Sequence, residues 1–145
     1  MSAGVFCTRE VDLADADESV RDAAARMRDR NVGTLLVLDD DKMPIGIVTD
    51  RDLTVRVLAG GLDGYQTQVG DVMTSVPATI SEDTSLDVAL GVMRGGPYRR
   101  VPVVDAEGRL VGLLSVDDVL DVLADEFRQI GELLQREGPR SLAQP

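Results

Sequence analysis

The sequence contains no histidine, no tryptophan and a single cysteine among its 145 residues. Without histidine the chain cannot build a His-based metal site, a Ser-His-Asp triad or a Cys-His nucleophile pair. One cysteine cannot form an internal disulfide. Cys7 is interpreted either as a redox thiol or intersubunit link, or simply as a small residue near the first strand.

Long hydrophobic runs are also missing, and the N-terminus lacks a basic region followed by an apolar one. We therefore expect neither a membrane span nor a signal peptide, and predict a soluble cytoplasmic protein. The formal net charge of −11 disfavours nucleic acid as a partner, because non-specific nucleic-acid binding needs Lys and Arg to neutralise phosphates. With 43% hydrophobic and 28% charged residues, the chain has the composition of a folded domain.

The most informative feature is a repeated motif. Residues 46–53 (GIVTDRDL) recur as residues 112–119 (GLLSVDDV), 66 positions later (112 − 46). Each copy resembles a buried strand that runs into a helix. Each places a hydroxyl residue three positions before an aspartate: Thr49 and Asp52 form the first motif, and Ser115 and Asp118 the second.

Two interpretations of the motifs stay open. Residues at i and i+3 share a helix face beside N–H groups that have no partner within the helix, which suits a ligand with phosphate and sugar hydroxyls. The same pattern is also the capping-box signature, in which the hydroxyl and carboxylate bind only the helix's own N–H groups. Duplication of the motif favours the ligand site.

The repeat extends well beyond the motifs, because residues 8–58 and 74–124 align without a gap. Such a fixed offset indicates two copies of one supersecondary unit. We predict an α/β (α+β) fold in which each copy runs strand, helix, strand, strand, helix. Because about 50 residues is near the lower limit for an unaided core, the copies should pack into one body with pseudo-two-fold symmetry.

The predicted boundaries are a first repeat at 8–60, a linker at 61–72, a second repeat at 73–125, a helical extension at 126–137 and a tail at 138–145. Within the first repeat we expect strands at 11–13, 34–38 and 45–48, and helices at 19–30 and 50–59. Within the second we expect strands at 78–80, 101–104 and 110–114, and helices at 85–93 and from 116 onward.

The repeated units also resemble a known domain family. The tandem units resemble a pair of cystathionine-β-synthase (CBS) domains over roughly residues 8–125. The resemblance rests on the two motifs, on residues 71–74 (DVMT) and on residues 99–105 (RRVPVVD). The chain is similar to small stand-alone CBS-pair proteins of bacteria and archaea. The resemblance implies a non-catalytic sensor that needs no cofactor and binds AMP, ADP, ATP or S-adenosylmethionine in clefts between the repeats.

The resemblance also assigns residues. It implies that Thr49 and Ser115 contact phosphate and that Asp52 and Asp118 contact ribose. A carboxylate can accept hydrogen bonds from both ribose hydroxyls, which supports this assignment. A phosphate at the following helix N-terminus would also meet free N–H groups.

Arg99 and Arg100 resemble the basic pair that reaches phosphate in CBS sites, although both could also be solvated surface residues. The aligned first-repeat positions, Gly33 and Thr34, carry no charge. We therefore expect the cleft of the second motif to be the better phosphate site. Arg51 is interpreted either as a partial substitute in the first motif or as a partner of its acidic neighbours.

The adenine is expected in an apolar slot lined by first-strand residues. By position these are Val76, Pro77 and Ala78 in one copy, and Val11 and Asp12 in the other.

Beyond residue 124 an apolar stripe continues through Phe127, Ile130, Leu133 and Leu134. It could fold back on its own module or pack against another copy. The resemblance favours a homodimer through the CBS disk and this helix. Gly138 and Pro139 should end the helix.

Three function classes follow. The first is a nucleotide sensor that signals to an unidentified effector protein. The second is a ligand-free interaction module whose motifs are only caps and which acts through its homodimer surface. The third, an enzyme or redox protein, is weakest because the motif aspartates have no evident base, nucleophile or metal partner.

Overall fold

The computed structural model describes residues 1–75, 78–96 and 99–136. The first repeat contains β1 (Leu13–Ala14), α2 (Val20–Arg30), β2 (Thr34–Leu38), β3 (Pro44–Thr49), α3 (Asp50–Asp52) and the π-helical η1 (Leu53–Leu58). The second contains β5 (Ile80–Ser81), α5 (Leu86–Arg94), β6 (Arg100–Val104), β7 (Leu110–Ser115) and α6 (Val116–Arg136). The predicted α/β order is confirmed in both repeats. Three short elements were not predicted: α1 (Ala3–Phe6), α4 (Val69–Val72) and β4 (Thr74–Ser75).

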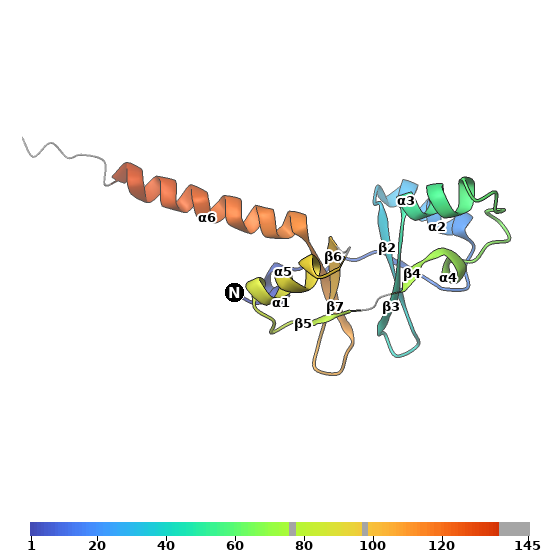
Figure 1. The fold of residues 1–145 in the computed structure, drawn as a ribbon, viewed down its shortest axis with the longest axis horizontal. Helices are drawn as coiled ribbons and strands as arrows, with labels where there is room; N and C mark the ends of the chain where they lie inside the picture. The colour runs from blue at the N-terminus through green and yellow to red at the C-terminus, as the bar shows by residue number, and fades with distance from the viewer. Residues whose placement is uncertain (76–77, 97–98, 137–145) are drawn as a thin grey trace, which may run out of the picture.

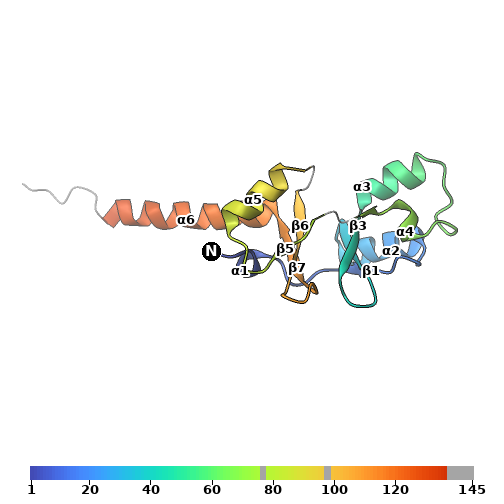
Figure 2. The ribbon, with the colours of Figure 1, turned by 60° about the horizontal axis from the view of Figure 1, so that its bottom comes forward.

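Each repeat has its own sheet, with strand orders β1-β2-β3-β4 and β5-β6-β7. β1 runs parallel to β2, which forms an antiparallel hairpin with β3, and β5, β6 and β7 repeat this arrangement. The two sheets lie next to each other at the centre of the molecule, and the helices lie on their outer sides (Figures 1 and 2). The two repeats therefore meet through their sheets.

The segments that precede each repeat are exchanged between the two sheets. β4, which follows the first repeat, pairs with β3 and places Thr74 opposite Ile47. At the equivalent place in the second sheet, the N-terminal Thr8 pairs with Leu113 through two backbone hydrogen bonds of 2.9 Å. Because both pairs are related by the offset of 66 positions, the exchange follows the pseudo-two-fold symmetry of the repeats.

The exchange also builds the hydrophobic cores. Val69 and Val72 of α4 pack into the first core with residues of α2, β2 and β3. Ala3 and Cys7 pack into the second with residues of α5, β6 and β7. Across the described ranges there are two core clusters, one in each repeat. Each repeat of about 50 residues thus completes its hydrophobic core with a short segment that lies outside its own strands and helices.

The leading glycine of each motif is where the exchanged segment crosses the sheet. A Cβ at Gly46 would overlap the Sδ of Met73, and one at Gly112 would lie 2.6 Å from the carbonyl oxygen of Thr8 and 2.7 Å from the Sγ of Cys7. Real Cβ atoms do not approach so closely. Gly112 therefore faces backbone that would have to shift, whereas at Gly46 the flexible side chain of Met73 would have to move. Cys7 is 8% exposed, and burial raises the pKa of its thiol. It is therefore a small buried residue beside β7.

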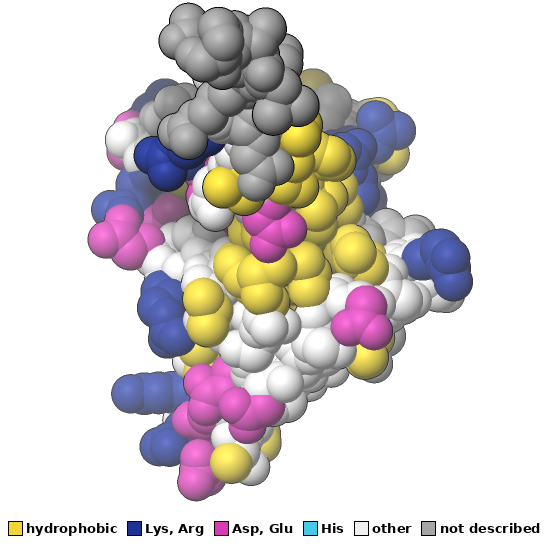
Figure 3. Space-filling view, turned by 90° about the vertical axis from the view of Figure 1, so that its left-hand side faces the viewer, with side chains coloured by type: hydrophobic (Ala, Val, Ile, Leu, Met, Phe, Trp, Pro, Cys, Tyr) yellow, Lys and Arg dark blue, Asp and Glu magenta, His cyan; other side chains and the backbone are white. Residues whose placement is uncertain are grey.

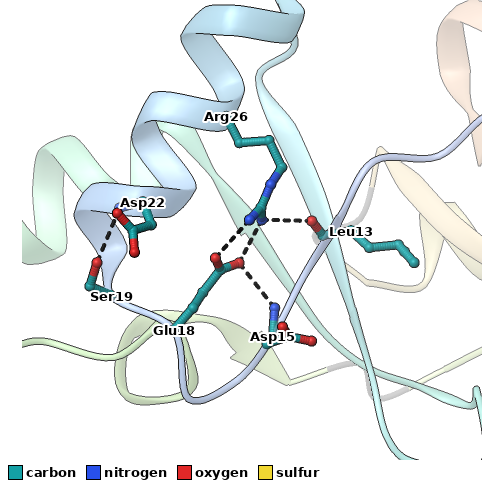
Figure 4. A network of polar contacts seen from close by, with 6 residues as sticks. All are labelled: Leu13, Asp15, Glu18, Ser19, Asp22 and Arg26. Carbon is teal, nitrogen blue, oxygen red and sulfur yellow. Dashed lines mark hydrogen bonds and ion pairs between the residues drawn. The ribbon is translucent and has the colours of Figure 1, made fainter.

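A polar network fixes the start of α2. The guanidinium of Arg26 donates to both carboxylate oxygens of Glu18 at 2.6 and 2.8 Å and to the carbonyl oxygen of Leu13 at 2.8 Å (Figure 4). These hydrogen bonds hold the pKa of Glu18 below its usual value. The Ser19 hydroxyl caps the helix by accepting from the backbone N–H of Asp22. The network thereby joins β1 to α2.

The helix expected at 50–59 divides into α3 and η1. The Thr54 hydroxyl donates to the carbonyl oxygen of Asp50 at 3.0 Å, and the N–H of Ala59 reaches back five residues to the carbonyl oxygen of Thr54. A hydroxyl that binds the preceding turn competes with the α-helical ladder, which accounts for the wider π-helical turns.

No helix within the described residues is both long enough and apolar enough to cross a membrane. The tail predicted at 138–145 lies outside the described residues.

Candidate functional site

The first motif forms the joint between β3 and α3. The Thr49 hydroxyl accepts from the backbone N–H of Asp52 at 3.2 Å, and Oδ2 of Asp52 accepts from the backbone N–H of Thr49 at 2.9 Å. This is a complete capping box. The guanidinium of Arg56 lies 3.7 Å from Oδ1 of Asp52 and donates to the carbonyl oxygen of Val72. Arg56 therefore links the motif to the exchanged α4.

The second motif forms the same joint between β7 and α6. The Ser115 hydroxyl accepts from the Asp118 N–H at 3.1 Å, and Oδ2 of Asp118 accepts from both the N–H and the hydroxyl of Ser115. The exchanged N-terminal segment adds one contact, because the Thr8 hydroxyl donates to Oδ1 of Asp118 at 3.2 Å. The capping interpretation thus holds for both motifs, although both also line clefts.

The larger cleft, of about 620 Å³, is the first-motif cleft, which lies between the repeats. It is lined by Thr49 and Asp52 of the motif together with Ala78, Arg99 and Arg100 of the second repeat. Its other described lining residues are Gly33, Thr34, Ile47, Asp50, Arg51, Arg56, Thr74, Ser75 and Pro102. One cleft therefore combines the hydroxyl and carboxylate of one repeat with the basic pair of the other.

The smaller cleft, of about 240 Å³, is the second-motif cleft. Ser115 and Asp118 line it together with Val11 and Asp12 of the first repeat, and Arg100 reaches it as well. The other described lining residues are Thr8, Glu10, Val32, Gly33, Thr34 and Leu113. Residues just before the first strand of each repeat, rather than in the strand itself, therefore line the cleft of the other repeat's motif.

The two clefts differ in charge. The described lining of the first-motif cleft contains four arginines and two aspartates, which are Arg51, Arg56, Arg99, Arg100, Asp50 and Asp52. The described lining of the second-motif cleft contains one arginine and three carboxylates, which are Arg100, Glu10, Asp12 and Asp118. An anion is attracted to the first cleft and repelled by the second. The charges of these two clefts thus favour the first-motif cleft for an anion, whereas the sequence favoured the second. Arg99 and Arg100 also lie beside Ser115 in a third, smaller pocket.

Three of the first cleft's arginines are available to a ligand. Among the described residues, no ion pair holds the side chain of Arg51, Arg99 or Arg100, and all three are exposed. Only Arg56 is already engaged, with Asp52. A solvated guanidinium can turn toward phosphate oxygens in bidentate geometry without breaking a protein contact.

The residues expected around the adenine are only partly placed. Ala78 lies in the first-motif cleft, and Val11 and Asp12 lie in the second. Asp12 is paired with Arg30, an exposed arginine at the end of α2. Val76 and Pro77 lie outside the described residues.

Sequence reasoning missed Arg56 and Thr8 as neighbours of the motif aspartates. Arg56 follows Asp52 by four residues, a spacing that places both side chains on one helix face and could have indicated the contact. Thr8 is far from Asp118 in sequence, and only the exchange of segments brings the two together.

The CBS domain family model matches residues 3–59 and 69–125. The chain belongs to the CBS domain family. The two matches begin at α1 and α4, so each matched segment includes the exchanged helix as well as the repeat that follows it.

Curated relatives include small CBS-pair proteins. The chain is 37% identical over 120 residues to the uncharacterized protein YlbB of Bacillus subtilis, covering 77% of this chain and 80% of the relative. It is 34% identical over 119 residues to Hypoxic response protein 1 of Mycobacterium tuberculosis, covering 82% of this chain and 78% of the relative. It spans 62% of the uncharacterized protein MK0525 of Methanopyrus kandleri, at 30% identity and 84% coverage of this chain.

Solved CBS-pair structures share the fold. The crystal structure of CBSX2 in complex with AMP matches with a TM-score of 0.70 and 30% identity, over 86% of this chain and 96% of that one. Hypoxic Response Protein I with two coordinated zinc ions matches with a TM-score of 0.74 and 30% identity, over 83% and 98%. CBS pairs are generally regulatory modules rather than catalysts.

Proposed function

We propose that this CBS pair is a cytoplasmic sensor that binds an adenine nucleotide or related adenosyl ligand in the first-motif cleft and signals its presence to a partner protein. The observation that carries the proposal is the lining of that cleft, where Thr49 and Asp52 face a surplus of arginines. CBSX2, which is 30% identical, binds AMP, which supports an adenosyl ligand of this class.

The ligand's parts match different walls of the cleft. The phosphate lies within reach of Arg99 and Arg100, where charge-assisted hydrogen bonds are strongest. The ribose hydroxyls donate to Asp52, whose Oδ1 is held only by the 3.7 Å contact with Arg56. The adenine occupies the apolar part of the wall, which Ile47, Ala78 and Pro102 provide.

Isothermal titration with AMP, ADP, ATP and S-adenosylmethionine tests the proposal. Arg99→Gln and Arg100→Gln should each weaken nucleotide binding by roughly 5- to 10-fold, since an exposed charge-assisted hydrogen bond contributes about 1–1.5 kcal/mol. Arg109→Gln is the matched control, because Arg109 pairs with Asp105 in the β6–β7 turn and is absent from the described lining of both clefts.

A second pair of variants ranks the clefts. Asp52→Asn should weaken binding by about 10-fold, while its remaining carbonyl oxygen can still accept from the Thr49 N–H and preserve the cap. Asp118→Asn should change affinity by less than about 2-fold. If Asp118→Asn weakens binding and Asp52→Asn does not, the choice of cleft is wrong. If the folded wild-type chain binds none of the four compounds, the sensor function is wrong.

The second candidate is a ligand-free module that acts as a homodimer through the CBS disk and the C-terminal helix. The observation in its favour is that both motifs already form complete hydrogen-bonded caps. A dimer that forms normally but binds no nucleotide would support this function over the first.

A further inference from the structure

α6 has more apolar surface than its own repeat covers. Of its 21 residues, only Val119 is buried. The helix leaves the second repeat and projects away from the body of the molecule (Figure 1). Most of its length therefore lacks a partner within the described part of the chain.

The exposed apolar residues of α6 form one straight stripe, which we call the α6 seam. Its members are Leu120, Leu123, Phe127, Ile130 and Leu134, which are 55%, 38%, 72%, 53% and 65% exposed. They are separated by three, four, three and four residues, the spacing at which two helices interlock side chains. Hydrophobic side chains gather on the end of the molecule from which α6 projects, with charged side chains at the margins (Figure 3).

The flanks of the seam differ. Ala124 and Gly131 lie on one side of it seven residues apart, and a Cβ at Gly131 would meet nothing within 4 Å. Small residues there leave room for a second helix to approach closely. On the opposite face, Arg128 pairs with Asp125 at 2.7 Å and with Glu132 at 2.6 Å. The ion pairs thus mark the solvent face, and the seam marks the face open to a partner.

The seam matches a reversed copy of itself. Between Leu123, Phe127, Ile130 and Leu134 the separations are four, three and four residues, which read the same in both directions. An antiparallel second helix therefore presents the same positions at the same heights. Such a pairing sets Leu123 against the partner's Leu134 and Phe127 against the partner's Ile130.

Charge selects the same orientation. The first half of α6 carries five acidic residues, Asp117, Asp118, Asp121, Asp125 and Glu126, and no basic one. The second half carries Arg128 and Arg136 with only Glu132. A parallel pair sets the acidic halves together, whereas an antiparallel pair sets each acidic half beside a mildly basic one and opposes the helix dipoles.

We infer that two copies of this chain associate through antiparallel pairing of their α6 seams. The inference concerns the C-terminal helix contact of the homodimer named above rather than the CBS disk, and it is independent of nucleotide binding. The overlap of residues 121–136 spans about 24 Å at 1.5 Å per residue. The pair thereby places the two CBS bodies at opposite ends of a two-helix connection.

The first test measures the mass of the full chain by light scattering during gel filtration at about 50 μM. The wild type should be a dimer, and the double variant Phe127→Asp/Ile130→Asp a monomer. Its CBS repeats should stay folded by circular dichroism, since neither side chain lies in a core, but it should melt at a lower temperature because it no longer gains stability from association. Gln129→Asp, which adds charge on the solvent face, is the control and should remain dimeric. A monomeric wild type, or a double variant that stays dimeric, overturns the inference.

Orientation is tested by oxidative cross-linking in a Cys7→Ala background. An equimolar mixture of the Leu123→Cys and Leu134→Cys chains should form a mixed disulfide, and Leu134→Cys alone should form little. Efficient cross-linking of Leu134→Cys to itself indicates parallel helices and refutes the antiparallel arrangement. Nucleotide titration of the Phe127→Asp/Ile130→Asp monomer separates the two proposals, because its affinity should stay within about 2-fold of wild type whether or not the dimer forms.

Discussion

Substituting Gly112 by alanine tests whether the exchanged N-terminal segment completes the second repeat. The new Cβ would lie 2.6 Å from the Thr8 carbonyl oxygen and 2.7 Å from the Cys7 sulfur, so one side of the contact must move. Overpacking of this kind costs about 1–3 kcal/mol. If Thr8 separates from Leu113, two backbone hydrogen bonds are lost, each contributing about 0.5–1.5 kcal/mol. Either route gives an expected loss of about 1–3 kcal/mol in the free energy of unfolding.

The matched variant is Gly46→Ala in the first repeat, where the new Cβ meets the flexible side chain of Met73 rather than the backbone. It should cost about 1–2 kcal/mol, and Met73→Ala should relieve most of this clash. Cys7→Ala should not relieve Gly112→Ala, because the carbonyl oxygen of Thr8 remains in place. Urea unfolding followed by circular dichroism measures each value. Neutral surface substitutions change the free energy of unfolding by roughly 0.5 kcal/mol at most. If Gly112→Ala has an effect this small, the N-terminal segment does not pack against Gly112 as described.

Two further predictions concern titratable groups. Arg26 lowers the pKa of Glu18, so the stabilisation by Glu18 is present above its unfolded pKa and is lost as the pH falls through its folded pKa. Glu18→Gln should therefore cost about 1–2 kcal/mol of unfolding free energy at pH 7 and should weaken the loss of stability at acid pH. An unchanged loss of stability at acid pH would contradict the network. Burial raises the pKa of the Cys7 thiol and shields it from reagents. Cys7 should therefore react with a thiol reagent at least roughly 100-fold faster in denaturant than in the native protein. Equal rates would show that α1 does not cover Cys7.

Local patterns in the sequence were sufficient for the main elements. The apolar run at 34–38 followed by three aspartates predicted β2 with its observed bounds, because a short buried strand next to an acidic turn has few alternatives. The amphipathic spacing of Val20, Ala23 and Met27 likewise predicted α2 to within one residue of its start. These features depend only on neighbours within a few positions along the chain.

The exchange of segments could not be predicted in this way. α1 and α4 each have four residues, too few to show helical periodicity, and β4 is a two-residue strand whose partner is 27 positions earlier. For the same reason the sequence assigned Arg99 and Arg100 only to the motif of their own repeat. Both do lie in a pocket with Ser115, but they also line the cleft of the other repeat. The offset of 66 identifies equivalent residues, but not which repeat's cleft they enter.

The exchange also has a consequence for synthesis. The first core is complete once residue 75 has left the ribosome, but Thr8 must wait for Leu113 before it can pair. At typical translation rates this delay lasts roughly 5–20 s. During that time α1 has no surface to pack on, and Cys7 is an exposed thiol. Oxidants and chaperones in the cell therefore meet this cysteine in the nascent chain, before the finished protein covers it.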